Sequence, residues 1–279
     1  MGSATTTTAT GTAAHIDTGE GSGPGGLPVL LLHGWTGSKE DFAAVIPRLA
    51  DRRRVLAPDL PGHGAAPPAA DGDYSLAAHV GVVRALLDRA GIDAFHMVAH
   101  SHGGLIAQRV AYVMAQRVGS MTLIGSGLGA LGDASREMVV RVAIAARDRG
   151  MSAAWAEVRG EHGGPGGEES PHDAFVRKRF LSMPPAAVVG VASNLVTAMP
   201  LGAFLHGIDF PVLVCHGEGD DTWLPHEQQL LARRIAGAAY RVIPDALHSP
   251  AVENPDGLMA DLEPFLAAAD ATAGAGSTP

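Results

Sequence analysis

The sequence predicts an α/β fold in which a mostly parallel β-sheet is flanked by helices and interrupted once by a helical insertion. Short apolar runs alternate with longer helix-like segments, which is the pattern of strands joined by crossover helices. The alternation fails only between the apolar runs at 120–124 and 210–215. Hydrophobic residues make up 46% of the 279 residues and aromatic ones only 5%, so we expect a substantial core built mainly of Ala, Val and Leu.

The strands are predicted from short runs rich in Leu and β-branched residues. They lie at residues 28–33, 54–58, 95–100, 120–124, 210–215 and 239–243. An earlier pair, 5–9 and 12–17 around Gly11, is predicted to form a β-hairpin at one edge of the sheet. Helices are predicted between the strands at 39–50, 75–90, 102–117, 226–236 and 256–268.

The break in this alternation divides the chain into two parts. Residues 1–130 and 207–279 are predicted to form the core, and residues 131–206 a helical cap over the ends of the strands. Within the cap, helices are expected around 138–145, at 172–182 and at 186–198. The glycine-rich stretch 160–167 should hold no regular structure and be mobile, and the tails 1–10 and 271–279 should be frayed.

Charge and composition argue against several classes of partner. The 20 basic and 29 acidic residues give a net charge of −9, which disfavours a nucleic-acid or anionic-membrane surface. No apolar run approaches the length of a membrane span and no secretory signal pattern is visible, so we expect a cytoplasmic protein without membrane contact. The single cysteine, Cys215, lies in an apolar run and is expected to be a buried structural thiol.

The segment 99–104, AHSHGG, contains a candidate catalytic serine. It lies between a predicted strand and a predicted helix. A serine at such a turn is lifted above the sheet, and small residues two positions before and after it, here Ala99 and Gly103, relieve backbone crowding. The backbone amide of His102 then points toward the serine at the positive end of the helix. Ser101 is therefore a candidate nucleophile, with the alternative that it caps the helix.

A serine hydroxyl needs a base, and the base needs a group that orients it. His248 follows the last predicted strand, and Asp220 and Asp221 follow the strand before it. Because ligand and catalytic groups collect at the carboxyl ends of parallel strands, these groups are expected to meet Ser101 above one sheet edge.

The order Ser101, then Asp220 or Asp221, then His248 resembles that of the α/β-hydrolase family. Three further motifs agree with this family: LLHGWTG at 31–37 is similar to its His-Gly turn, DLPGHG at 59–64 to its glycine-rich loop, and SPAVENP at 249–255 to the segment after its catalytic histidine. The resemblance covers roughly residues 12–268 and implies the α/β-hydrolase fold. It also implies an oxyanion hole formed by the backbone amides of Trp35 and His102.

The family's spacing leaves two candidates for the triad acid. Counting from Gly217 selects Asp220, whereas counting back from Pro225 selects Asp221. Asp220 is preferred because a strand end is the more rigid reference, and Asp221 stays open.

The resemblance implies acyl transfer. Ser101 attacks a carbonyl while His248 takes its proton, the acid orients the imidazole, and water then releases the acyl group. The expected protein is a carboxylesterase-like serine hydrolase that cleaves an ester-type bond in a small molecule, without metal or organic cofactor. Lactonase, thioesterase, perhydrolase and carbon–carbon hydrolase activities are alternatives on the same triad. A non-catalytic ligand-binding member is disfavoured because it would need no triad, and the sequence gives no basis for an oligomeric state.

Two positions depart from the family's commonest pattern. Ala99 replaces a glycine, and His102 stands where an apolar residue is common. The imidazole of His102 is expected to form a polar wall of the pocket, with a catalytic role as the alternative. A metal at His100 and His102 is not expected, since no acidic or cysteine ligand nearby completes the set. Trp35 and Trp223 are expected to line the pocket. Five apolar cap residues are expected either to line it or, preferably, to form the cap's own core: Phe180, Met183, Met199, Phe204 and Leu205.

Overall fold

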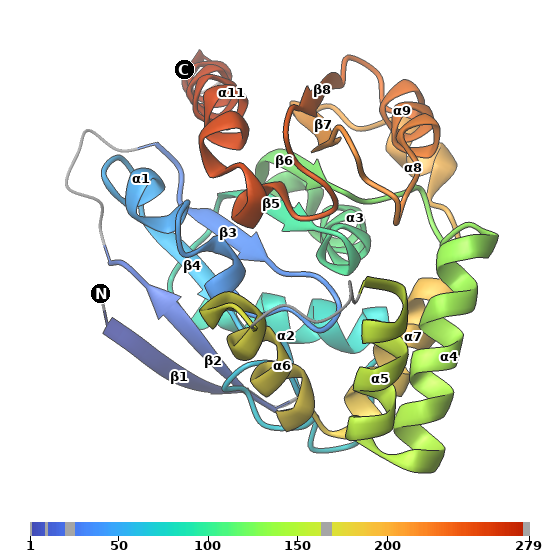
Figure 1. The fold of residues 1–279 in the computed structure, drawn as a ribbon. Helices are drawn as coiled ribbons and strands as arrows, with labels where there is room; N and C mark the ends of the chain where they lie inside the picture. The colour runs from blue at the N-terminus through green and yellow to red at the C-terminus, as the bar shows by residue number, and fades with distance from the viewer. Residues whose placement is uncertain (1, 9–10, 20–25, 163–168, 276–279) are drawn as a thin grey trace.

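The computed structural model describes residues 2–8, 11–19, 26–162 and 169–275, and it has the predicted α/β architecture (Figure 1). In these ranges one eight-stranded sheet has the order β1-β2-β4-β3-β5-β6-β7-β8. Strands β3 to β8 pair in parallel, and the hairpin β1–β2 joins the edge at β4 in antiparallel orientation, as the sequence predicts. The strands are β1 Gly2–Thr8, β2 Gly11–Asp17, β3 Val29–Leu32, β4 Val55–Pro58, β5 Phe95–His100, β6 Val118–Ile124, β7 Val212–Gly217 and β8 Ala239–Ile243.

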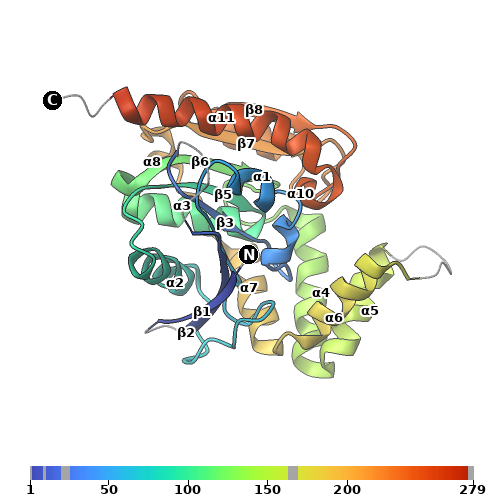
Figure 2. The ribbon, with the colours of Figure 1, turned by 90° about the vertical axis from the view of Figure 1, so that its left-hand side faces the viewer.

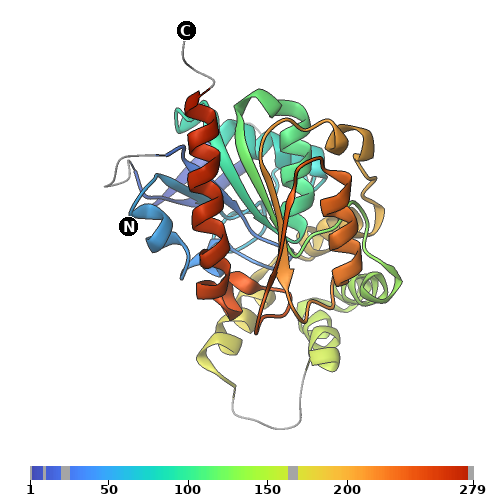
Figure 3. The ribbon, with the colours of Figure 1, turned by 90° about the horizontal axis from the view of Figure 1, so that it is seen from above.

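Helices cover both faces of the sheet because its central strands are apolar on both sides. In β3, Leu30 and Leu32 belong to one core cluster and Val29 and Leu31 to the other. The first cluster holds α2 (Leu76–Arg89), α3 (His102–Met114), α8 (Gly202–His206) and α9 (Pro225–Arg234), and the second holds α1 (Ile46–Ala50) and α11 (Pro255–Ala275). Figure 3 shows α11 in red and α9 in orange on opposite sides of the strands.

The insertion between β6 and β7 contains four longer helices, which gather to one side of the sheet away from α11 (Figure 2). They are α4 (Asp133–Arg149), α5 (Met151–His162), α6 (Pro171–Ser182) and α7 (Pro185–Thr197). They share a separate apolar cluster that includes Val142, Phe180 and Val188, and Ala69 and Tyr74 from the segment before α2 join it. Most of this insertion therefore has a core of its own and is not an extension of the two core layers.

Several boundaries differ from the sequence prediction. The expected helix 39–50 is two pieces, the 3₁₀ helix η1 (Lys39–Phe42) and α1, because Pro47 lies in the first turn of α1 and favours a fresh helix start there. The end of the expected helix 102–117 tightens into the 3₁₀ turn η2 (Ala115–Arg117). Helix α5, and the short α8 and α10 (Pro250–Glu253), were not predicted.

The irregular segments are shorter than predicted. Within the stretch 160–167, residues 160–162 continue α5, while residues 163–168 lie outside the described part. The tails expected to fray contribute β1 at Gly2–Thr8 and the last turn of α11 up to Ala275. The strand pairing of β1 with β2 satisfies backbone groups that a frayed tail would leave to water.

The lone thiol is structural. Cys215 is fully buried in β7, and burial raises the pKa of its thiol to about 12. A thiol with so high a pKa holds almost no thiolate at neutral pH, so it is not a nucleophile. Among the described helices, no single one is long and apolar enough to cross a membrane; the pair α6–α7 meets that test only when joined across a 98° bend.

Asp270 fastens α11 to the sheet. Its Oδ1 accepts hydrogen bonds from the backbone amide of Leu27 (2.9 Å) and from Nε2 of the buried His96 (3.0 Å), and its Oδ2 lies 3.0 Å from Nη1 of Arg53. His96 is tied in turn to Ser120 on β6 through a 2.8 Å hydrogen bond at Nδ1. One carboxylate therefore connects the C-terminal helix to β5, β6 and the start of β3.

We predict that Asp270→Ala lowers the free energy of unfolding by about 2–4 kcal/mol, because it leaves the buried guanidinium of Arg53 and the imidazole of His96 without their acceptor. Urea unfolding followed by circular dichroism measures this. Asp256→Ala is the control, since the carboxylate of Asp256 pairs with Arg48 while 93% exposed, and its loss should change stability little. Equal effects of the two variants would contradict the anchoring role of Asp270.

Candidate functional site

Ser101 occupies a strained turn between β5 and α3. Its backbone has φ 55° and ψ −120°, a left-handed conformation that a residue with a side chain rarely adopts. The turn needs the glycine two positions later, because a Cβ on Gly103 would lie 2.5 Å from the carbonyl oxygen of Leu32 in β3. The side chain of Ser101 makes no capping hydrogen bond to α3, so the helix-cap alternative is wrong.

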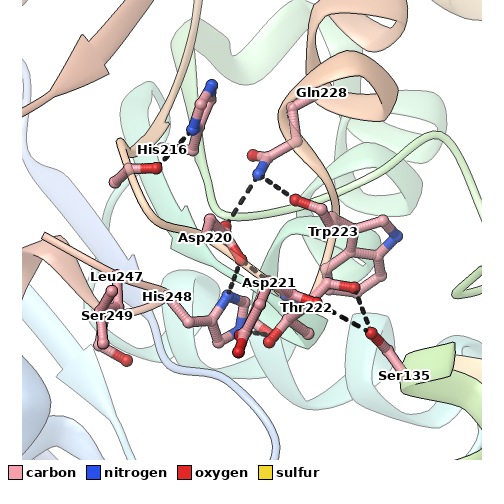
Figure 4. A network of polar contacts seen from close by, with 12 residues as sticks. Ser135, His216, Asp220, Asp221, Thr222, Trp223, Gln228, Leu247, His248 and Ser249 are labelled. Carbon is pink, nitrogen blue, oxygen red and sulfur yellow. Dashed lines mark hydrogen bonds and ion pairs between the residues drawn. The ribbon is translucent and has the colours of Figure 1, made fainter.

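The structure brings Ser101, His248 and Asp220 into one hydrogen-bonded chain. Nε2 of His248 lies 3.0 Å from Oγ of Ser101, and Nδ1 of His248 lies 3.0 Å from Oδ1 of Asp220. Figure 4 shows His248 pointing at Asp220. The neighbouring Asp221 is exposed, and its polar contact within the described residues is made by its backbone oxygen, which accepts from the hydroxyl of Ser135. The geometry thus favours Asp220 over Asp221 as the partner of His248.

The carboxylate of Asp220 is fully buried yet held in its charged form. Burial alone would raise its pKa, but hydrogen bonds from His248, from the amide of Thr222 (2.9 Å) and from Nε2 of Gln228 (2.8 Å) outweigh that cost and lower it. Gln228 also donates to the carbonyl of Trp223 at 2.7 Å, so its amide is fixed from two sides (Figure 4). With an ionised acceptor at Asp220, the proton of His248 resides on Nδ1, and Nε2 is left to accept from Ser101.

The loop around His248 is held by a second carboxylate. Oε2 of Glu253 accepts hydrogen bonds from the amides of Leu247 (2.7 Å) and Ser249 (3.0 Å), the two residues that flank His248. At the end of β5, Nε2 of His100 donates to the carbonyl oxygen of His248 at 2.8 Å. Burial, together with the nearby His248, lowers the pKa of His100 to about 4, so His100 is a neutral hydrogen-bond donor at neutral pH.

Two backbone amides near Ser101 remain available for a ligand. Neither the amide of Trp35 nor that of His102 hydrogen-bonds to any residue in the described part of the chain. The amide of His102 belongs to the first residue of α3 and therefore lies at the positive end of that helix. Gly34 allows the close approach of the two turns, since a Cβ there would lie 3.0 Å from Cβ of Ser101.

A cavity of about 310 Å³ opens above Ser101. The residues that line it come from the turn after β3, the Ser101 turn, the His248 loop and α6 of the insertion: Gly34, Trp35, Thr36, Gly37, Asp41, His100, Ser101, His172, Val176, Arg179, His248, Ser249, Val252 and Glu253. The wall is therefore largely polar, and the insertion contributes one side of it.

Trp35 lines this cavity as predicted, but Trp223 does not, since it is buried beside His248 with a ring-centroid separation of 6.4 Å. None of the five apolar candidates lines it either. Phe180 and Met183 lie in the core of the insertion, Leu205 and Phe204 pack against the sheet, and Met199 is 75% exposed. The preferred interpretation, packing within the cap, holds for the first two only.

The expectation that the imidazole of His102 forms a polar pocket wall is wrong. The side chain is fully buried beneath α7, where Nδ2 of Asn194 donates to its Nε2 at 3.2 Å, and it is absent from the cavity lining. Burial lowers its pKa well below the ordinary value, and the neighbouring His79, whose ring lies edge-on at 5.3 Å, adds to the shift. His102 is thus a neutral packing residue whose backbone amide faces Ser101.

No group of three His, Cys, Asp or Glu side chains within residues 2–8, 11–19, 26–162 and 169–275 is arranged to hold a metal ion. In particular, His100 is engaged with the carbonyl of His248, and His102 with Asn194.

The chain is similar in sequence and fold to known proteins. A family model described as the alpha/beta hydrolase fold matches residues 28–144. The chain is 30% identical over 283 residues to 2-hydroxymuconate semialdehyde hydrolase of Pseudomonas sp. (strain CF600), covering 94% of each protein. An esterase structure from Thermogutta terrifontis has a TM-score of 0.80 at 26% identity and covers 97% of this chain and 100% of that one. The protein therefore belongs to the α/β-hydrolase family.

Another relative is similar to this chain over part of its length only. The dihydrolipoyllysine-residue acetyltransferase component of the acetoin cleaving system of Pseudomonas putida is 39% identical over 128 residues, which is 46% of this chain. The chain spans about a third of the length of that protein, 34%.

Four residues that contact the site or hold its loops were not predicted from the sequence: Gln228, Glu253, Asp41 and Arg179. Gln228, Asp41 and Arg179 stand in segments without a catalytic motif, and each becomes significant only through the contacts that the fold gives it. Glu253 could have been found, because it lies in the SPAVENP segment that resembles the one after the family's catalytic histidine.

The lowered pKa of Asp220 predicts a pH-dependent contribution to stability. A carboxyl group with a depressed folded-state pKa stabilises the fold above its unfolded pKa of about 3.9 and loses that contribution as the pH falls through the folded value. The difference in unfolding free energy between the protein and Asp220→Asn should therefore be largest from pH 5 to 7 and shrink below about pH 4. Urea titrations at pH 7, 5 and 3.5 measure it. Asp221→Asn is the control and should match the unsubstituted protein at each pH; a constant Asp220→Asn difference would contradict the interpretation.

Proposed function

We propose that the protein is a serine hydrolase that cleaves a carboxylic ester-type bond of a small molecule through an acyl-enzyme on Ser101. The observation behind this proposal is the continuous chain of hydrogen bonds from buried Asp220 through His248 to Ser101, which ends at a cavity beside two unpaired amides. A helix-capping serine or a packing histidine would need none of these neighbours.

The proposed reaction follows from the positions of the protons. Nε2 of His248 accepts the Ser101 proton as Oγ attacks the substrate carbonyl, and the charge that develops on the imidazole is balanced by Asp220. The amides of Trp35 and His102 stabilise the oxyanion, an effect worth about 3–4 kcal/mol per donor in comparable sites. His248 then protonates the leaving alcohol, and water activated by the same imidazole releases the acid. The proposal requires no metal or organic cofactor.

The insertion takes part in this proposal as a cap. Its helix α6 supplies His172, Val176 and Arg179 to the cavity wall. We therefore assign residues 131–206 as a cap over a core of residues 1–130 and 207–279. The net charge of −9 and the buried free thiol support the proposed cytoplasmic location and a small-molecule substrate instead of a nucleic acid.

Carbon–carbon bond hydrolysis is the second candidate. It is favoured by the similarity over 94% of both chains to a protein named 2-hydroxymuconate semialdehyde hydrolase. The two candidates differ in their substrates, since only the first requires turnover of simple esters.

We predict that a fluorophosphonate probe labels Ser101 and that Ser101→Ala abolishes the label, as measured by mass spectrometry of the labelled peptide. Ser120 is an internal control. Its Oγ is 2.8 Å from Nδ1 of His96, whose Nε2 is 3.0 Å from Asp270, yet serine and imidazole are both fully buried, and it should remain unlabelled. Folded protein that takes up no label at Ser101 would favour a binding role.

Asp220→Asn should lower kcat on a reactive ester by about 10³–10⁴-fold, because an amide cannot hold the imidazole in the required tautomer. Asp221→Asn should retain nearly full turnover, because the exposed Asp221 side chain has no contact with His248. Initial rates on p-nitrophenyl acetate separate the two. A near-normal Asp220→Asn rate would move the acid to another residue.

A further inference from the structure

One face of α6 forms the insertion's wall of the cavity. His172, Val176 and Arg179 are spaced by four and three residues, so they lie on the same side of the helix, and all three line the cavity. Val176 is apolar, so Arg179 is the strongest hydrogen-bond donor on this wall. Its side chain is only 9% exposed, which fixes the guanidinium in one place.

Arg179 uses one end of its guanidinium within the protein. Nη1 donates to Oγ of Ser38 at 3.0 Å and to Oδ1 of Asp41. Nε is buried without a hydrogen-bond partner, and Nη2 donates to no described residue. A ligand in the cavity cannot reach the buried Nε, so Nη2 is the donor left for it, and Nη2 can give a hydrogen bond to one acceptor there. Because an unpaired donor on a largely buried side chain is costly, Nη2 calls for an acceptor from a ligand.

The side chains around the guanidinium of Arg179 do not favour an anionic ligand. Asp41 also lines the cavity and cancels the charge of Arg179, and the carboxylate of Glu253 lines the same cavity. The other titratable groups that face it are the histidines His100, His172 and His248. A substrate carboxylate that binds near Arg179 would therefore meet one positive side chain, Arg179 itself, and two negative ones, Asp41 and Glu253.

We propose that the Arg179–Asp41 pair makes this cavity select uncharged substrates that carry a second carbonyl or similar neutral acceptor, and that Asp41 is the residue that rejects carboxylate-bearing ones. A neutral carbonyl accepts from Nη2 without bringing charge near Asp41, whereas a carboxylate is repelled by Asp41. The inference rests on the proposed ester-cleaving function and names the substrate class for it.

Asp41→Asn tests the charge with little change of shape. The asparagine oxygen can still accept from Arg179 or from the backbone amide of Ser38, which now donates to Asp41 Oδ2 at 3.1 Å. The negative charge is lost, so Arg179 gains a net attraction for a carboxylate. Glu169→Gln is the matched control, because Glu169 pairs bidentately with Arg177 on the solvent side of the same helix and does not line the cavity.

The substrates are two series of matched esters. Ethyl pentanoate, ethyl 4-oxopentanoate and monoethyl succinate place an alkyl, a keto or a carboxylate group at the same distance on the acyl side. Acetoxyacetone and acetoxyacetate differ in the same way on the alcohol side. We expect the unsubstituted protein to favour the keto ester over the carboxylate by about tenfold or more in kcat/KM in at least one series. Asp41→Asn should reduce that ratio about tenfold, and Glu169→Gln should leave it unchanged.

A preference of the unsubstituted protein for the carboxylate esters, or a ratio that Asp41→Asn leaves unchanged, would overturn the inference. Arg179→Met gives a second reading that does not depend on Asp41. It should lower the preference for ethyl 4-oxopentanoate over ethyl pentanoate, and an unchanged preference would show that Arg179 does not contact the substrate.

Failure of the proposed function is distinguished by a binding experiment. If none of the esters is cleaved, the ester-cleaving proposal fails, and calorimetric titration of Ser101→Ala with acetoxyacetate and with monoethyl succinate still tests the charge. Adding Asp41→Asn to that variant should tighten the Kd of at least one of these anions about tenfold. An unchanged Kd for both would overturn the inference independently of turnover.

Discussion

The left-handed backbone of Ser101 is the constraint on which the rest of the site depends. A φ of 55° at a residue with a side chain costs about 1–3 kcal/mol, and it persists because neighbouring strands leave the turn no other path. The turn lies between β5 and α3 and directly against β3, so close that a Cβ on Gly103 would strike the carbonyl of Leu32. The same turn brings Oγ within 3.0 Å of Nε2 of His248 and leaves the amide of His102 without a partner among the described residues. The packing of this turn against the parallel sheet thus offsets the cost of its strained backbone.

The sequence predicts well what depends on local pattern and order. All six main strands appear near their expected residues because apolar runs buried on both faces leave a strong signal. Ser101 was chosen as the candidate nucleophile from its setting between strand and helix, and it does lie between β5 and α3. The sequence favoured Asp220 but left Asp221 open as the acid. Two adjacent loop residues have nearly the same spacing, and they differ in which side chain the backbone directs inward. That choice is made by Gln228 and Thr222, which hold the Asp220 carboxylate from across the loop.

Side-chain direction is the level at which sequence reasoning failed. His102 was expected in the pocket because it is polar and follows the nucleophile, yet a residue in the first turn of a helix can direct its side chain and its amide to opposite sides. Asn194 from α7 supplies the contact that makes the buried position tolerable. Arg179 presents the reverse case. Nothing in the local pattern of α6 distinguishes it from Arg177, and only the fold shows that one faces solvent and the other the cavity.

The two Ser–His–Asp chains in this protein show why position matters more than residue identity. Ser120, His96 and Asp270 form a similar chain with closely similar distances, but the two ring nitrogens are exchanged: Nδ1 of His96 contacts the serine and Nε2 the aspartate. The first set lies toward the amino ends of β5 and β6, where Ser120 is an ordinary strand residue with its amide in the sheet, and no cavity reaches its hydroxyl. Asp270 is shared with Leu27 and Arg53, so that set serves to fasten α11. The second set lies at the carboxyl ends, where strands give way to turns and backbone amides are left without partners. A hydrogen-bonded triad becomes a candidate for chemistry only where the sheet ends and leaves such amides beside an open cavity.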